Sequence, residues 1–143
     1  MNGECVMASA GLELQAAIYQ KLRSDAVLTA LLGGAKVFDD VPQQTTFPYI
    51  TFGQSLMRDW STGSEDGNEH VVTLHVWSRA AGKKKVHEIM STIEGLLHDR
   101  PLLLSGFRLI NFRHEFSDAR RDNDGETYHG TVRYRAVTEA EAV

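Results

Sequence analysis

The chain has 143 residues, of which 42% are hydrophobic and 24% charged, and its formal net charge is −4. These values are ordinary for one globular domain, and a domain of this size buries roughly 70% of the surface that its unfolded chain exposes. The acidic balance, without a strongly basic segment, excludes a dedicated DNA or RNA binder, because such proteins carry a concentrated cationic face. The single cysteine, Cys5, excludes an intramolecular disulfide and fits folding in a reducing cytosol.

The two ends of the chain differ from its middle. Residues 1–9 show no periodicity and are expected to be a disordered tail, in which Met7 offers an alternative start to Met1. Residues 10–138 are expected to form the single domain, and residues 139–143 a short acidic tail. No secretory signal pattern is present, and the apolar runs are too short to cross a bilayer.

Two helices are predicted before the first glycine pair. Apolar residues recur at helical spacing from Gly11 onward, at Leu14, Ala17, Ile18 and Leu22. A second, short helix is predicted over residues 26–32, with Ser24-Asp25 as turn and N-cap and Gly33-Gly34 as its end. Val37-Phe38 is a short extended segment.

The strongest helical pattern covers residues 81–98. Its apolar residues form one continuous stripe with charges opposite, namely Val86, Ile89, Met90, Ile93, Leu96 and Leu97. Pro101 ends the helix, because the residue before a proline disfavours helical geometry. We expect this helix to pack across the sheet, with core residues Leu74, Val76, Trp77, Ile89, Ile93 and Leu97.

Four strands are predicted, at residues 49–56, 71–77, 107–116 and 128–137. Strand 71–77 carries large groups on both faces, so it is expected to be central and covered on both sides. The fold class is therefore α+β, in the order α-α-β-β-α-β-β, with a mostly antiparallel sheet of four or five strands and helices mainly on one face. The strand 71–77, the helix and the strand 107–116 are expected to form one right-handed crossover.

Six histidines raise the question of a metal site: His70, His75, His87, His98, His114 and His129. Zinc ligands usually come in closely spaced pairs, and no such pattern is present here. His114 and His129 are expected to face each other across the last hairpin, with Glu115 nearby. We interpret them as a hydrogen-bonded or solvated pair and predict no metal and no cofactor.

No catalytic pattern stands out. Gly82 and the three lysines after it lack the upstream glycine and the hydroxyl residue of a phosphate-binding loop, so the lysines are interpreted as a solvated surface. No G-x-S-x-G segment is present. The acid pairs Asp39-Asp40 and Glu65-Asp66 occur in turn-like sequence, whereas acid–base catalysis needs carboxylates in distinct, partly buried settings. We therefore predict no catalytic residues.

A collinear set of short segments resembles one family. The segments are Leu31-Leu32-Gly33-Gly34, Phe38-Asp39, Pro48-Tyr49-Ile50-Thr51-Phe52-Gly53, Val76-Trp77-Ser78, and Asp124-Gly125 leading to Tyr128-His129-Gly130. In this order, from about Leu14 to the last strand, they resemble the tail terminator (tail-completion) proteins of long-tailed phages and gene transfer agents, in particular small DUF3168-like members.

The resemblance implies structural work in a virion tail or neck, after assembly in the host cytoplasm. Such proteins form a ring, usually of six subunits, on the finished tail tube. The ring stops polymerisation of the major tail protein and offers a surface to the head-side connector, while DNA passes through the lumen without specific binding. The alternatives are another neck or head-closure component and, from a different class, a small ligand-binding domain or enzyme.

Two polar connections, residues 56–68 and 117–127, are predicted as arms for a head-to-tail ring. The interface candidates in them are Arg58, Asp59, Trp60, Glu65, Asp66, Arg120, Arg121 and Asp122. Arg120 and Arg121 of one subunit are expected to meet carboxylates of the next. The acidic excess of the first connection also fits a channel lining that avoids phosphate binding.

Overall fold

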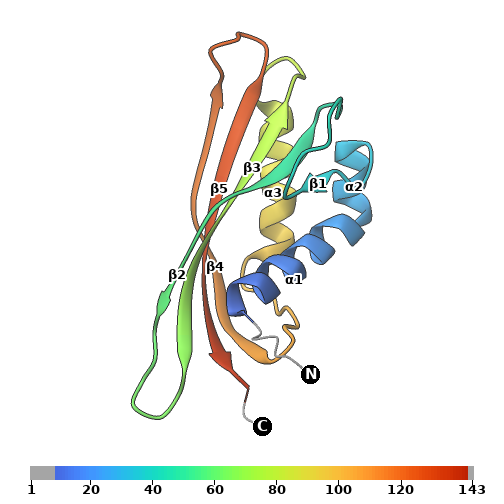
Figure 1. Cartoon of the computed structure of the whole chain (residues 1–143). Helices are drawn as coiled ribbons and strands as arrows, with labels where there is room; N and C mark the ends of the chain where they lie inside the picture. The colour runs from blue at the N-terminus through green and yellow to red at the C-terminus, as the bar shows by residue number, and fades with distance from the viewer. Residues whose placement is uncertain (1–8, 142–143) are drawn as a thin grey trace.

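The computed structural model describes residues 9–141 and contains three helices and five strands there (Figure 1). The elements are α1 (Ala10–Ser24), α2 (Ala26–Leu32), β1 (Val37–Phe38), β2 (Tyr49–Asp59), β3 (Gly67–Ser78), α3 (Lys84–Leu97), β4 (Phe107–Arg121) and β5 (Tyr128–Ala140). The predicted α+β class and element order are confirmed, and β1 is the predicted short extended segment. Cys5 and Met7 lie outside the described residues, as does all of the predicted N-terminal tail except Ser9.

The five strands form one sheet in the order β1-β2-β3-β5-β4. Neighbouring strands are antiparallel except β1 and β2, which are parallel. β3 is central, as predicted. Because β3 and β4 both run antiparallel to β5, they run parallel to each other, and α3 provides the predicted crossover between them.

All three helices lie on one face of the sheet (Figure 1). The core between the layers includes Leu74 and Val76 of β3 and Ile89, Ile93 and Leu97 of α3, and each of these side chains is fully buried. α3 lies close against β5 at Gly130, where a Cβ atom would lie only 2.5 Å from Val86 Cγ1 and 2.9 Å from Met90 Sδ.

Local signals set the helix ends. Ser9 caps α1 by accepting a hydrogen bond from Leu12 N–H, so it belongs to the helix rather than to a disordered tail. Asp25 caps α2 through Leu28 N–H at 2.9 Å, and Gly33 ends α2 with φ +77°. The prediction that the third helix begins at residue 81 is wrong by three residues. Gly82 has φ +83°, which no residue of a right-handed helix adopts, so α3 begins at Lys84.

All four predicted strands extend beyond their predicted limits. β2 continues to Asp59 and β3 begins at Gly67, so the connection between them shrinks from the predicted residues 56–68 to residues 60–66. β4 continues to Arg121, which shortens the predicted connection 117–127 to residues 122–127. β5 runs to Ala140, two residues into the predicted C-terminal tail. The predicted arms are therefore mostly the ends of long paired strands, which are joined by short turns.

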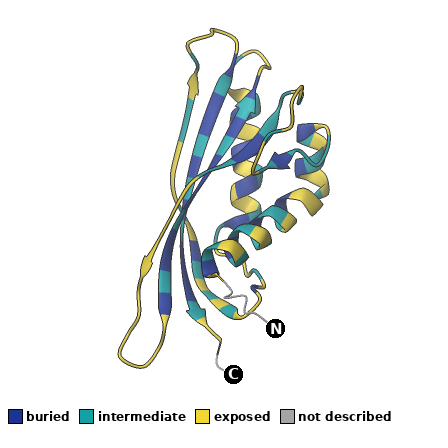
Figure 2. Ribbon diagram, in the orientation of Figure 1, coloured by how far each residue is buried: buried dark blue, intermediate teal, exposed yellow. Residues whose placement is uncertain are grey.

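The face of the sheet opposite the helices, called here the open face, is not covered by any described element (Figure 2). It carries Val71, Thr73, His75 and Trp77 of β3, so the expectation that this strand is covered on both sides is wrong. Trp77, expected in the core between the layers, lies half-buried on the open face. Its indole Nε1–H donates to Thr51 Oγ1 at 3.0 Å.

Candidate assembly surfaces

The predicted interface residues fall into two groups at opposite ends of the sheet. Residues 59–66, called the β2–β3 tip, precede Gly67 at one end of β3. Residues 120–127, called the β4–β5 tip, precede Tyr128, which pairs with Ser78 at the other end of β3. β3 has twelve residues, so the two tips are about 36 Å apart at 3.3 Å per residue. A contact between the two groups therefore requires two subunits.

The β2–β3 tip combines an aromatic side chain with carboxylates. Trp60 is 51% exposed, and the guanidinium of Arg135 lies 5.2 Å from its ring centre. Asp59 accepts from Ser61 Oγ at 2.6 Å, and this hydrogen bond together with the Ser61 N–H lowers the pKa of the Asp59 carboxyl. Glu65 lies 3.5 Å from Arg108. The Asp66 carbonyl accepts from Ala140 N–H, which ties the tip to the end of β5.

Next to this tip, Glu69 bridges two arginines on the open face. Its carboxylate accepts from Arg58 Nε at 2.7 Å and from Arg135 Nε. The hydrogen bond from Arg135, followed by that from Arg58, holds the pKa of Glu69 below its usual range despite desolvation. Arg58 therefore already forms an ion pair within its own subunit, although its side chain is 65% exposed.

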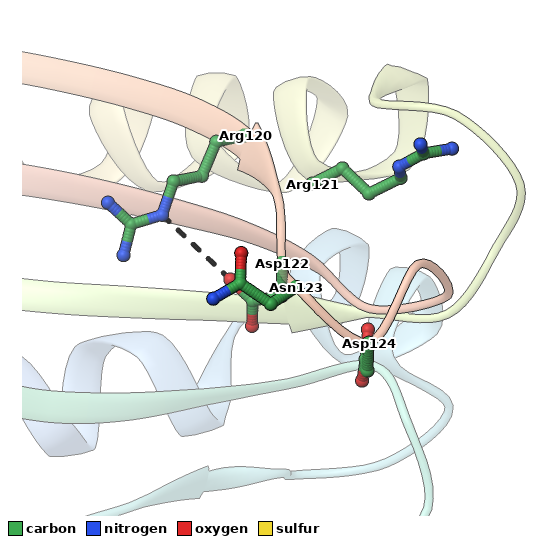
Figure 3. Close-up of a pocket in the computed structure, with 5 residues that line it drawn as sticks. All are labelled: Arg120, Arg121, Asp122, Asn123 and Asp124. Atoms are coloured by element: carbon green, nitrogen blue, oxygen red, sulfur yellow. Dashed lines mark ion pairs between the residues drawn. The ribbon is translucent and has the colours of Figure 1, made fainter.

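The β4–β5 tip carries Arg120, Arg121 and Asp122 around a shallow depression of about 590 Å³, which Asn123 and Asp124 complete (Figure 3). Arg120 Nε lies 3.8 Å from Asp122 Oδ1, and Figure 3 shows Arg121 directed away from this pair. Asp124 holds the turn through Thr127 Oγ1 at 2.6 Å and the N–H groups of Thr127 and Glu126, which lower the pKa of its carboxyl to about 2. A rigid turn thus presents two arginines pointing in different directions.

A histidine pair lies on the open face near this tip. His75 Nδ1 and His129 Nε2 are 2.7 Å apart, and the Trp77 ring stacks on His129 with 4.0 Å between ring centres. Burial lowers the pKa of both imidazoles, and the positive charge of Arg120 lowers it further. The space is tight, because a Cβ atom on Gly53 would lie 2.3 Å from His75 Nε2.

The predicted pairing of His114 with His129 is wrong. β4 has a register shift between His114 and Phe116, and His114 pairs with Tyr134 on the helix side, whereas His129 pairs with Arg120 on the open face. The two imidazoles therefore lie on opposite faces of the sheet. Within residues 9–141, no three His, Cys, Asp or Glu side chains are arranged to hold a metal ion.

The structure also reveals surface residues that periodicity did not single out. Five of the eight large hydrophobic side chains that are exposed in the described residues belong to β2, to the turn that follows it or to β4: Leu56, Met57, Trp60, Ile110 and Phe116. Leu56 and Met57 were assigned to the predicted connection 56–68, and Ile110 and Phe116 to a predicted strand whose exposed face the sequence did not identify.

Comparisons with known proteins give a consistent result. The family described as Tail completion protein gp17 matches residues 16–139. Tail completion protein gp17 of Bacillus phage SPP1 is 25% identical over 122 residues, which span 85% of this chain and 89% of the phage protein. A chain in the solved structure "Virion of native gene transfer agent (GTA) particle" matches with a TM-score of 0.86 and 30% identity, over 94% of this chain and 100% of that chain. None of the helices in residues 9–141 is long and apolar enough to span a membrane.

Proposed function

Since the chain belongs to the Tail completion protein gp17 family and is a structural component of a virion tail rather than an enzyme, we propose that it is a tail terminator. In this role it forms a ring, with six subunits as the proposed number, on the end of the finished tail tube. The ring stops addition of the major tail protein and joins the tail to the head-side connector. DNA passes through its lumen without specific binding.

The observation that carries the proposal is the full-length match to a chain of a gene transfer agent virion, at 30% identity. A match over the whole fold, rather than over one motif, supports a shared place in the particle. The position of the two tips adds a physical argument. A ring requires two different surfaces on each subunit, and this sheet presents different chemistry at its two ends.

The test of this role is tail length. Particles assembled without the chain are expected to have tails of uncontrolled length and no attached heads, and supply of the wild-type chain restores both. Tails of normal length that lack heads would instead identify a head-closure component. Normal, DNA-delivering particles without the chain would overturn the proposal.

We also propose that Arg120 and Arg121 contact carboxylates of the next subunit, with Asp59, Glu65 and Asp66 as partners. Support comes from the distance between the two tips, which prevents this contact within one subunit. The variant Arg120→Glu with Arg121→Glu places like charges together, so ring formation or tail capping should fail while the monomer stays folded. The matched control, Lys83→Glu with Lys84→Glu, makes the same charge change at exposed residues on α3 and should assemble.

A charge exchange makes this test specific. Adding Asp59→Arg and Asp66→Arg to the double arginine variant should restore assembly, because the attraction returns with reversed signs. Normal assembly of the double arginine variant would remove the tips from the interface and leave the tail-terminator role standing.

A further inference from the structure

Two strand edges remain without a partner in the described part of the chain. On one side of the sheet, β1 pairs with β2 only at Ile50 and Thr51. Beyond this point, residues 53–59 of β2 have no neighbouring strand on their outer side, and residues 54–59 are exposed. Unpaired backbone N–H and C=O groups on a strand edge are a template for another strand.

On the opposite side, the outer edge of β4 is covered over part of its length. Asp99 N–H donates to the Phe112 carbonyl at 2.7 Å, and His114 N–H donates to His98 Nδ1 at 2.9 Å. The residues that follow α3 therefore provide hydrogen-bond partners for the outer backbone groups of this part of β4. The register shift between His114 and Phe116 ends it. Residues 116–121 then continue in regular pairing with β5 and, within residues 9–141, have no strand on their outer side.

A groove runs beside this free stretch of β4. It has a volume of about 340 Å³, with His87, Met90, Ser91 and Glu94 of α3 on one side and Ser117, Asp118 and Ala119 of β4 on the other. A strand added to β4 would place alternate side chains into the groove and onto the open face. The edge of β2 offers an apolar side chain on each face of the sheet. Met57, which pairs with His70, lies on the helix side, and Leu56, which pairs with Val71, lies on the open face.

Strand direction selects a second copy of the chain as the partner. β2 and β4 run antiparallel to each other, since each pair of neighbours between them is antiparallel. A rotation about an axis along the strands preserves their directions. The β2 edge of one copy therefore meets the β4 edge of the next in antiparallel orientation, which continues the pattern of the sheet and leaves no free edge once a ring closes.

We propose that residues 55–59 of one subunit pair with residues 116–121 of the next as antiparallel strands, with Met57 entering the groove between α3 and β4. This inference rests on the proposed ring and names the contact that builds it. The net charges of the two edges are opposite in sign. β4 carries Arg108, Arg113, Arg120 and Arg121 against Glu115 and Asp118, whereas residues 49–66 carry Asp59, Glu65 and Asp66 against Arg58.

Register decides which arginines meet the carboxylates. If Met57 pairs near Asp118, the β2–β3 tip of one subunit lies beside Arg113 of the next rather than beside Arg120 and Arg121. If the strands slide so that Asp59 faces Arg120, the contact between tips described above forms, but residues 55–57 then lie beyond Arg121 and the strand pairing proposed here is lost. The experiment below measures this register directly.

Engineered disulfides test the pairing. In a Cys5→Ser background, Met57→Cys is combined with Ser117→Cys, Ala119→Cys or Arg121→Cys, whose positions share the helix side of the sheet. Facing residues of antiparallel strands have Cα atoms about 4.5 to 5.5 Å apart, within the range for a disulfide. At least one combination should give a ladder of covalent oligomers on oxidation of rings, whether rings form in solution or on tail tubes.

The control combination is Met57→Cys with Asp118→Cys. Asp118 pairs with Thr131 on the open face, so its side chain lies on the other face from Met57 and should give no ladder. Rings that assemble but give no ladder with any helix-side combination, or an equal ladder with the control, would overturn the strand pairing and leave the ring intact.

A substitution provides the second measurement. Met57→Lys should raise the concentration needed for ring assembly about tenfold or more, because lysine on a strand edge opposes pairing and must enter the groove. Val27→Lys makes the same kind of change at an exposed residue of α2 and should leave assembly unchanged. Both variants should melt at the parent temperature, since both positions are about half exposed or more. If wild-type chain forms no ring in solution or on tubes, the proposed function itself fails.

Discussion

The two faces of the sheet are formed by the same strands but differ in burial and in the side chains that they carry. On the helix-covered face, side chains such as Leu74, Val132 and Tyr134 are completely buried against the helices. On the open face, the equivalent positions carry ion pairs, such as Glu69 with Arg58, and the pair of His75 with His129. The comparison indicates that one face supplies the free energy of folding, whereas the other face and the strand edges are available to partners.

Glycine shows the same difference at single-residue scale. Gly130 allows α3 to lie directly on β5, and an added Cβ atom would meet two core side chains there. Gly53 leaves room for the His75 ring beside β2, and an added Cβ atom would lie 2.3 Å from His75 Nε2 and 3.4 Å from Thr73 Cγ2. An added methyl group at Gly130 would therefore press on the packed core, whereas one at Gly53 would press on side chains of the open face.

The largest expected effect is a core truncation. Ile93→Ala removes a fully buried side chain between α3 and the sheet, and should lower the free energy of unfolding by about 2 to 5 kcal/mol. Denaturant unfolding followed by circular dichroism measures it. Val27→Ala, at a 63% exposed position, is the control and should change stability by about 0.5 kcal/mol or less. An Ile93 variant that unfolds like the parent would contradict its assignment to the core.

A methyl group on each glycine sharpens the comparison between faces. Gly130→Ala should cost about 1 to 3 kcal/mol, because Val86 and Met90 must shift within a packed core. Gly53→Ala should cost less, since the His75 ring can turn away at the expense of its hydrogen bond to His129. The same unfolding experiment compares the two variants, and a larger loss of stability for Gly53→Ala would contradict the expectation that the His75 ring can turn away.

Acidification should affect the open face first. The pKa values of His75 and His129 are lowered in the folded protein, so the unfolded chain takes up protons first as pH falls through about 6.5. The free energy of unfolding should therefore decrease below about pH 7, until the folded pKa values are reached. Asp124, with a pKa of about 2, contributes stability that is lost only at much lower pH.

The matched variants isolate the histidine pair. In His75→Gln with His129→Gln, the melting temperature should fall less between pH 7 and pH 5 than in the parent. Part of the decrease remains because burial also lowers the pKa of His70. His87→Gln, an exposed change on α3, should keep the full decrease. An unchanged decrease in the double variant would remove the pair as its source.

The smallest expected effect is that of metal removal. Protein without an affinity tag should contain no stoichiometric zinc by elemental analysis, and dialysis against chelator should leave its melting temperature unchanged. One zinc per chain after chelation would contradict the interpretation of the six histidines.

The elements that the sequence predicted well are those with a buried face. The third helix and strand β3 were predicted because their buried positions are apolar and recur at the spacing typical of a helix or a strand. The extensions of β2 and β4 were missed because neither face of a ribbon end is buried there. Residues 117–121 show no alternation between apolar and polar side chains, so only hydrogen bonding to β5 reveals them as strand.

The interface residues proposed from the sequence remain predictions. Trp60, Arg120 and Arg121 were selected from their polar surroundings, and the structure places them at the two ends of the sheet. The strand edges and the groove beside α3 were not foreseen, because sequence alone does not specify which strands lie outermost or where a register shift leaves an edge free.

The sequence by itself determined the α+β class, the order of elements, the core stripe of α3 and the family, since all of these depend on local pattern and collinear motifs. Only the tertiary structure decided that Trp77 lies on the open face, that His129 pairs with His75 rather than His114, and that the two tips lie at opposite ends. The physical reason is that strand order and register set these contacts. A shift of one residue moves a side chain to the other face of the sheet without changing the local pattern that a sequence displays.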